Sequence, residues 1–118
     1  MKQKNLLMKG DVPMSKRDIT ALVVKKQGEC EIQVLKDTLK SYQNIVEGYI
    51  ETVTFEMRDT LYVAICNEEG RLKGMPYNLS IAGKHLVGPV MFVRVDSENF
   101  ASLTADDIKH LKNMFNLE

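Results

Sequence analysis

The stretch that decides the fold is L-Y-V-A-I-C, residues Leu61 to Cys66, the longest uninterrupted apolar stretch of the chain. A short apolar run with β-branched and aromatic residues predicts a strand buried on both faces, which places it centrally in a sheet. The run is far shorter than the roughly 20 apolar residues of a membrane-spanning helix, so no membrane association is expected. With 118 residues and 44% hydrophobic side chains, the chain is expected to form one domain with its own core.

The sequence around this central strand predicts further strands of the same sheet. Residues 48–57 alternate apolar and polar side chains, and Arg58-Asp59-Thr60 turns the chain into the central strand. The apolar run Ile19 to Val24 and the alternating residues 30–34 predict a second hairpin around the turn at residues 26–29. A last strand is expected over residues 87–95.

Two amphipathic helices complete the prediction. Apolar side chains recur at helical spacing over residues 36–46, and Gly48 is expected near the end of that helix. A second helix is expected over residues 105–115, with Thr104 as N-cap and Asp107 at the third position of a capping box. The sequence therefore predicts an α+β fold: an antiparallel-dominated sheet of about five strands with two helices packed on it, in the order β-β-α-β-β-loop-β-α.

Balanced overall charge conceals an asymmetry along the chain. Residues 1–26 carry seven lysines and arginines against two aspartates, a net +5, so the other residues carry −5. We interpret residues 1–17 as a flexible basic N-terminal extension and residues 18–118 as a single α+β domain. Because an acidic body repels phosphate, nucleic-acid binding is unlikely except through the extension.

The chemistry of the chain points to a reducing compartment and to no bound metal. No apolar stretch of signal-peptide length follows the N-terminal lysines, so a cytoplasmic location is expected, and Cys30 and Cys66 are predicted to be buried free thiols. His85 and His110 lack partners at ligand spacing, and phosphate-loop, dinucleotide, zinc-protease and serine-hydrolase motifs are missing. We expect no metal, no cofactor and no catalytic set.

Glu51 breaks the pattern of its predicted strand. With a period of two, its carboxylate shares a face with Tyr49, Val53 and Phe55, where an ionised group must be paired, hydrated or at the rim of the sheet. Two interpretations follow. Either Glu51 orients a ligand or partner group at the mouth of the next long loop, or it bonds a backbone amide or a lysine, or is turned outward by a bulge.

The long connection at residues 67–85 is the second candidate region, because loops of this length are usually functional or disordered. Asn67 and Glu68 stand at the end of the central strand, where sites are commonly built, although an ordinary turn is the alternative. Arg71 suits a phosphate or carboxylate partner. The residues that we assign to ligand or partner binding are Tyr49, Glu51, Asn67, Glu68, Arg71, Pro76 and Asn78.

Three motifs resemble a family of small domains of unknown function that is frequent on phages, plasmids and conjugative elements of Gram-positive bacteria. They are E-G-Y-I-E at 47–51, N-E-E-G-R-L-K-G-M-P-Y-N at 67–78 and L-V-G-P-V at 86–90, and the similarity covers roughly residues 18–96. Members of that family show a glycine pair before Tyr-Ile-Glu, where this chain has Glu47-Gly48. The resemblance implies an accessory or defence-related gene on a mobile element and implies no reaction.

These observations favour a small accessory binding protein that engages a host protein or a small nucleotide-like ligand through the 67–85 loop. The alternatives are a hydrolase-like enzyme with Glu51 as general base beside Asn67 and Glu68, and weak nucleic-acid binding by the basic extension. An exposed edge strand such as residues 30–34 makes a homodimer possible.

Overall fold

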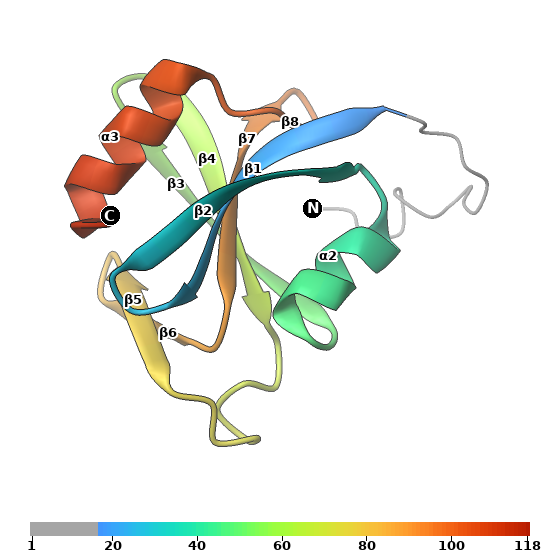
Figure 1. Cartoon of the computed structure of the whole chain (residues 1–118), viewed down its shortest axis with the longest axis vertical. Helices are drawn as coiled ribbons and strands as arrows, with labels where there is room; N and C mark the ends of the chain where they lie inside the picture. Colours follow the sequence, from blue (N-terminus) through green and yellow to red (C-terminus); the bar gives the residue numbers. More distant parts are fainter. Residues whose placement is uncertain (1–16) are drawn as a thin grey trace.

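The computed structural model describes residues 17–118, so the predicted extension, apart from Arg17, lies outside the described residues. These residues form an α+β fold with an antiparallel sheet at its centre (Figure 1). The elements, in chain order, are β1 (Asp18–Lys26), β2 (Glu29–Lys36), α2 (Leu39–Val46), β3 (Ile50–Met57), β4 (Thr60–Asn67), β5 (Tyr77–Ile81), β6 (Lys84–Val87), β7 (Val90–Asp96), β8 (Asn99–Ala101) and α3 (Ala105–Phe115).

The central sheet of the described chain has six strands. Its order is β2, β1, β7, β4, β3, and β8 pairs with the end of β7, while β5 and β6 form a separate two-stranded sheet. The strand predicted from Leu61 to Cys66 lies within the interior strand β4, whereas β7 occupies the middle of the sheet. The buried part of β4 runs from Tyr62 to Asn67, so the prediction of burial was wrong for Leu61, which is 42% exposed. Both predicted hairpin turns are confirmed, with positive φ at Gly28 in the first and at Arg58 and Asp59 in the second.

The two faces of the sheet carry different layers. One face packs against α3 and the β5–β6 hairpin, and the other packs against α2 (Figure 1). Alternate residues of each interior strand supply the two cores, as the period of a strand requires. In β4, Tyr62, Ala64 and Cys66 face α3 and the hairpin, while Val63 and Ile65 face α2.

The C-terminal helix agrees with its prediction and the first helix is shorter than predicted. In α3, the Thr104 hydroxyl accepts from the N–H of Asp107, and the Asp107 carboxylate accepts from the N–H of Thr104, which completes the capping box. The prediction of a helix from residue 36 was wrong by three residues. Thr38 has extended backbone and caps α2 through the N–H of Ser41, so the helix begins at Leu39.

The prediction of one long irregular loop at residues 67–85 was wrong for its second half. The β5–β6 hairpin occupies that half, and Leu79, Ile81 and Leu86 bury their side chains against the face that holds α3. Ala82 and Gly83 both have positive φ in the two-residue turn, as a tight hairpin requires. The irregular part of the connection is therefore the short segment between β4 and β5.

Two further expectations concern membranes and thiols. Within residues 17–118, no helix is both long and apolar enough to cross a membrane. Both cysteines are free thiols, and Cys66 is buried as predicted, but the prediction of burial was wrong for Cys30, which is only partly buried.

Candidate functional site

The side chain of Asn67 joins the end of β4 to the end of α2. Asn67 is buried, and its Nδ2 donates to the carbonyl oxygens of Val46 at 3.0 Å and Glu47 at 3.2 Å, while its Oδ1 accepts from the N–H of Glu69 at 2.7 Å. Gly48 leaves the necessary room, because a Cβ at that position would lie 2.7 Å from Nδ2. The polar atoms of Asn67 are therefore engaged in holding the backbone of this corner.

The next nine residues, 68–76, which we call the tip loop, form a folded turn. The N–H of Lys73 donates to the carbonyl of Glu69, and the N–H of Met75 donates to the carbonyl of Gly70, both at 3.0 Å. Met75 packs over Gly88, which has φ +75 and where an added Cβ would lie 2.5 Å from the Met75 sulfur. The backbone of the tip loop is thus tied to itself and to the segment before β7.

The most exposed large apolar side chain among the described residues is Leu72, at 88% exposure. It belongs to the tip loop, which lies at the bottom of Figure 1, and its sequence neighbours Arg71 and Lys73 are also exposed. The Arg71 guanidinium donates to the His85 carbonyl at 2.9 Å, which links the tip loop to β6. Single exposed apolar side chains are common on protein surfaces, but Leu72 is the one held furthest into water by a folded turn among the described residues.

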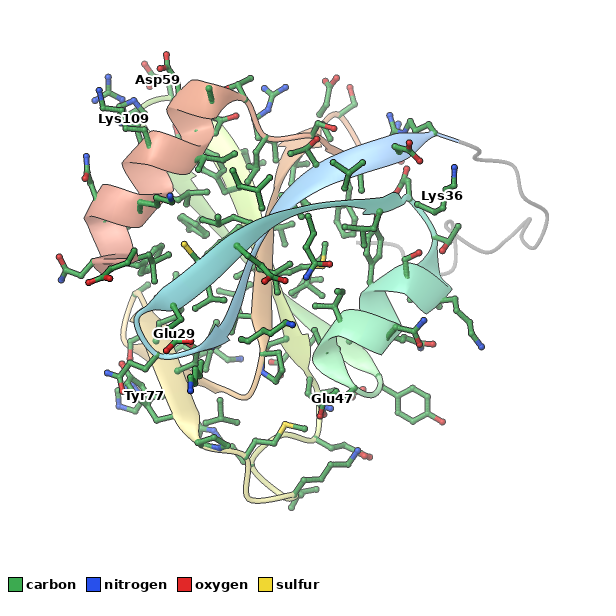
Figure 2. The ribbon with its side chains drawn as sticks, in the orientation of Figure 1. Glu29, Lys36, Glu47, Asp59, Tyr77 and Lys109 are labelled. Carbon is green, nitrogen blue, oxygen red and sulfur yellow. The ribbon has the colours of Figure 1, made fainter. Side chains whose placement is uncertain are left out.

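A polar hollow of about 380 Å³ opens on one side of the tip loop, and we call it the polar hollow. Tyr49, 64% exposed, belongs to it, and Figure 2 shows Glu47 at the same end of the molecule. The Lys73 Nζ lies 4.0 Å from Glu69 Oε1, and both side chains of this ion pair are exposed to water. The residues that line the polar hollow are Gln43, Asn44, Glu47, Gly48, Tyr49, Glu69 and Lys73.

A smaller pocket of about 90 Å³ lies on the other side of the tip loop. It brings together Glu51, Asn67, Glu68 and Arg71, all four of which the sequence assigned to a site. This volume is well below the roughly 300 Å³ at which pockets for small organic ligands begin. The remaining lining residues are Cys66, Leu72, Lys84, His85, Leu86 and Val87.

Glu51 is ion-paired in this small pocket. Its Oε2 lies 2.6 Å from Nζ of Lys84 on β6, and both side chains are partly exposed. This contact is the lysine pairing that the sequence left open as one interpretation. Burial, and secondly the negative charge of Glu51, raise the pKa of the neighbouring Cys66 thiol to about 11, so this thiol stays protonated near neutral pH and is a weak nucleophile.

Pro76 and Asn78, the last two residues assigned from sequence, lie at the base of the hairpin. The Pro76 carbonyl accepts from the N–H of Gly88 at 2.8 Å. Asn78 is 2% exposed, and its Nδ2 donates to the carbonyls of Val24 and Gly88, each at 2.8 Å. The side chain of Asn78 therefore joins β5 to β1 and to the start of β7 beneath the surface.

Sequence reasoning missed Leu72 and the polar hollow. Leu72 lies between Arg71 and Lys73 in the sequence. An isolated leucine in an otherwise polar turn was the local signal that could have indicated an exposed apolar residue. The polar hollow had no such signal, because α2, the start of β3 and the tip loop contribute to it from separate parts of the chain. Its position depends on the Asn67 bridge.

A Ser–His contact on the hairpin was also not predicted. The Ser80 Oγ lies 2.6 Å from His85 Nδ1 and 3.0 Å from the Tyr77 hydroxyl, and Ser80 and His85 are cross-strand neighbours. Tyr77 and His85 are exposed, and Figure 2 shows Tyr77 on the outer side of β5. Among residues 17–118, no group of three histidine, cysteine or acidic side chains is arranged to hold a metal ion.

Comparison with known proteins gives one family. No curated protein and no solved structure matches the chain. A family model matches residues 19–116, which extends beyond the motifs at 47–90 and includes α3. The chain belongs to the family described as domain of unknown function DUF3846.

Proposed function

We propose that this protein is a non-enzymatic binding module that engages a partner protein through the tip loop, with Leu72 as the central contact. The observation that carries the proposal is the 88% exposure of Leu72 on a turn whose backbone is hydrogen-bonded to itself and anchored by Met75. A contact residue that is already held in place loses little conformational entropy on binding. In the cell, the partner is a host protein, and the module is an accessory protein of a mobile element.

The charges around Leu72 define the chemistry of the partner. Arg71 and Lys73 flank it, whereas Lys84 in the small pocket is paired with Glu51. The complementary surface is an apolar depression for the leucine with acidic side chains at its rim. Tyr49 extends the same end of the molecule with a second exposed large side chain.

Two observations favour a protein over a small nucleotide-like ligand. The small pocket measures only about 90 Å³, and the acids Glu51 and Glu68 balance its cations Arg71 and Lys84. The larger polar hollow contains Glu47 and Glu69 against the single cation Lys73, so it repels phosphate. An enzyme that uses Glu51 as base is disfavoured by the ion pair of that carboxylate with Lys84.

The test compares two exposed apolar residues at different places. Tagged wild type, Leu72→Asp and Met114→Asp are used to capture proteins from the host lysate, and the captured partner is then purified and titrated against each variant. Met114, 49% exposed on α3, is the matched control. We expect Leu72→Asp to weaken binding by about 30-fold or more, the loss typical of a central contact, and Met114→Asp to bind like wild type.

Each opposite result overturns the proposal. A purified partner that binds Leu72→Asp as tightly as wild type places the interface elsewhere, and equal losses in both variants show a non-specific effect of added charge. A nucleotide that co-purifies with wild type in native mass spectrometry, and is retained by Leu72→Asp, makes the protein a small-ligand binder instead.

A further inference from the structure

The outer edge of β2 is an exposed sheet edge with apolar side chains. Among the described residues, β2 pairs only with β1, and it forms one end of the central sheet. Ile32 and Val34 lie on the face of the sheet that packs against α3, but they are not covered by that helix and are 55% and 64% exposed. Long apolar edge strands usually carry charges, prolines or bulges that prevent pairing with another chain. β2 contains no proline, and its charged residues Glu29, Glu31 and Lys36 leave residues 32–35 uncharged.

The main-chain groups of Ile32 and Val34 face outward from the sheet. The N–H of Thr20 donates to Ser102 Oγ, and the carbonyl of Thr20 accepts from the N–H of Leu103, so the main chain of Thr20 on β1 points away from β2. Val34 is the register partner of Thr20, so its N–H and carbonyl point away from β1. Two residues along, Ile32 has the same orientation.

We infer that β2 pairs antiparallel with β2 of a second copy, around a two-fold axis at Ile32. In this register Ile32 lies opposite Ile32 of the second copy, and Cys30 lies opposite Val34. The apolar side chains on one face therefore contact one another, and about six backbone hydrogen bonds form across the three pairs. The two central sheets become one continuous sheet.

The match of facing side chains favours this register over its neighbours. Here Glu31 lies opposite Gln33 of the second copy, and Glu29 lies opposite Leu35. A shift of the facing residue by two positions in one direction places Glu31 opposite Glu31, and in the other direction places the charged Lys36 opposite Cys30. Like charges directly opposite each other destabilise a strand pair, whereas the register centred on Ile32 has none along residues 29–35. This self-complementarity is the reason for a second copy of the chain as occupant rather than an unrelated strand.

The opposite edge of the sheet does not offer the same surface. The edge strand β3 carries Glu51 and Glu56, much as β2 carries Glu29 and Glu31, but its apolar residues Val53 and Phe55 are partly buried against the core. An edge strand whose apolar side chains already pack on its own core has less apolar surface to bury against a second copy. The pairing is thus expected at β2 alone.

The test combines light scattering with site-specific cross-linking of the full chain. At about 100 µM, wild type is expected at twice the monomer mass of 13.4 kDa, and Ile32→Lys at the monomer mass because two lysines then face each other. Met114→Lys, an exposed change on α3, is the matched control and keeps the dimer mass. A monomer mass for wild type up to 1 mM overturns the inference.

Cross-linking tests the register. In a Cys30→Ser background under oxidised glutathione, Ile32→Cys is expected to form a disulfide-linked dimer, because facing Cα atoms lie about 5.5 Å apart in a hydrogen-bonded pair, within disulfide range. Val34→Cys is expected to cross-link only when Cys30 is retained, since these two residues face each other. Cross-linking of Val34→Cys in the Cys30→Ser background, at the rate of Ile32→Cys, contradicts the register.

Discussion

The two helices are fastened to opposite faces of the sheet by similar groups in different positions. On the α3 face, Asp107 lies inside the helix, three residues after the N-cap Thr104, and is 7% exposed. On the α2 face, Asp37 lies just before the N-cap Thr38 and is 8% exposed. Both aspartates bond to a tyrosine and an arginine, but only Asp107 also caps its own helix.

The partners of Asp107 come from the sheet and from the helix itself. The Tyr62 hydroxyl donates to Oδ1 at 2.5 Å, Arg94 Nε lies 3.4 Å from Oδ2, and the N–H of Thr104 donates to Oδ2 at 2.8 Å. Burial alone raises the pKa of Asp107, but the hydrogen bonds from Thr104 and Tyr62 and the charge of Arg94 outweigh it, so the pKa lies below its ordinary value.

The partners of Asp37 come from its own end of the domain. Arg17 donates to Oδ2 from Nε at 3.1 Å and from Nη2 at 2.6 Å, and Nη2 also donates to the Phe100 carbonyl at 2.7 Å. The hydroxyl of Tyr42, on α2, donates to Oδ1. Asp37 thus ties α2 to the start of β1 and to β8, and its loss leaves the α2 cap at Thr38 in place.

The largest expected effect is the loss of Asp107. We expect Asp107→Ala to lower the free energy of unfolding by about 3 kcal/mol, because it removes the capping box and deprives the buried Tyr62 hydroxyl of its carboxylate acceptor. Asp37→Ala should cost less, about 2 kcal/mol, because the helix cap remains. Urea unfolding measures both values, and Asp106→Ala, an exposed change in the same turn, should stay within about 0.5 kcal/mol of wild type.

Acid sharpens this prediction. Because the folded-state pKa of Asp107 is lowered, its contribution is fully present above the unfolded pKa near 4 and is lost as the pH falls through the folded value. Asp107→Asn should therefore lose less stability than wild type between about pH 5 and pH 2. Equal losses for Asp107→Ala and Asp37→Ala at neutral pH would show that the cap adds nothing.

Removing each tyrosine hydroxyl should have a smaller effect. Tyr62→Phe and Tyr42→Phe are each expected to cost about 1.5 kcal/mol at neutral pH, the value of a hydrogen bond to a charged group. Burial raises the pKa of both tyrosines, that of Tyr62 to about 12, and the hydrogen bonds to Asp107 and Asp37 add to the shift.

Alkali separates the hydroxyl contribution from packing. A raised folded-state pKa gives stability that is fully present below the unfolded pKa near 10 and is lost as the pH rises through the folded value. Between about pH 9.5 and pH 12, the midpoint temperature of thermal unfolding of wild type should therefore fall more steeply than that of Tyr62→Phe or Tyr42→Phe. Tyr49→Phe, at an exposed position, should match wild type, and a wild-type slope in all three variants would contradict the assignment.

The two helix anchors also show what the sequence can reveal. The α3 anchor joins Thr104 to Asp107, three residues apart, so the capping pattern predicted this helix with its observed bounds. The α2 anchor joins Asp37 to Arg17, twenty residues away in the chain. The periodicity of the sequence therefore extended this predicted helix back through residue 36. No neighbouring residue indicated that the Asp37 side chain bonds to Arg17 and lies outside the helix.

The candidate site divides in the same way. The general location of the site was predictable from the sequence, because Asn67 ends the buried strand β4 and Glu68 follows it. Glu51 lies on the neighbouring strand β3, opposite Cys66. The ion pair of Glu51 was not predictable, because Lys84 belongs to a hairpin that was read as loop. The alternation of Leu79 and Ile81 was too short to distinguish a strand, and the Ala82-Gly83 turn was the missed local signal.

The smallest effect is expected at the C-terminal ends of the two helices, which both end in the left-handed conformation. Glu47 ends α2 with φ 68, and Asn116 ends α3 with φ 55. Asparagine adopts this conformation at a lower cost in free energy than glutamate does. We therefore expect Glu47→Gly to stabilise the protein by about 0.5–1 kcal/mol, and Asn116→Gly to change its stability by only a few tenths of a kcal/mol. Glu47→Ala keeps the Cβ and should give no gain.

Thermal unfolding of the three variants measures the difference. If Glu47→Gly and Glu47→Ala stabilise equally, the gain comes from the removal of a negative charge beside Glu69 in the polar hollow, and backbone strain is not its source. If Glu47→Gly destabilises, the glutamate side chain supports the corner that Asn67 holds, and its support outweighs the cost of the left-handed backbone at this position.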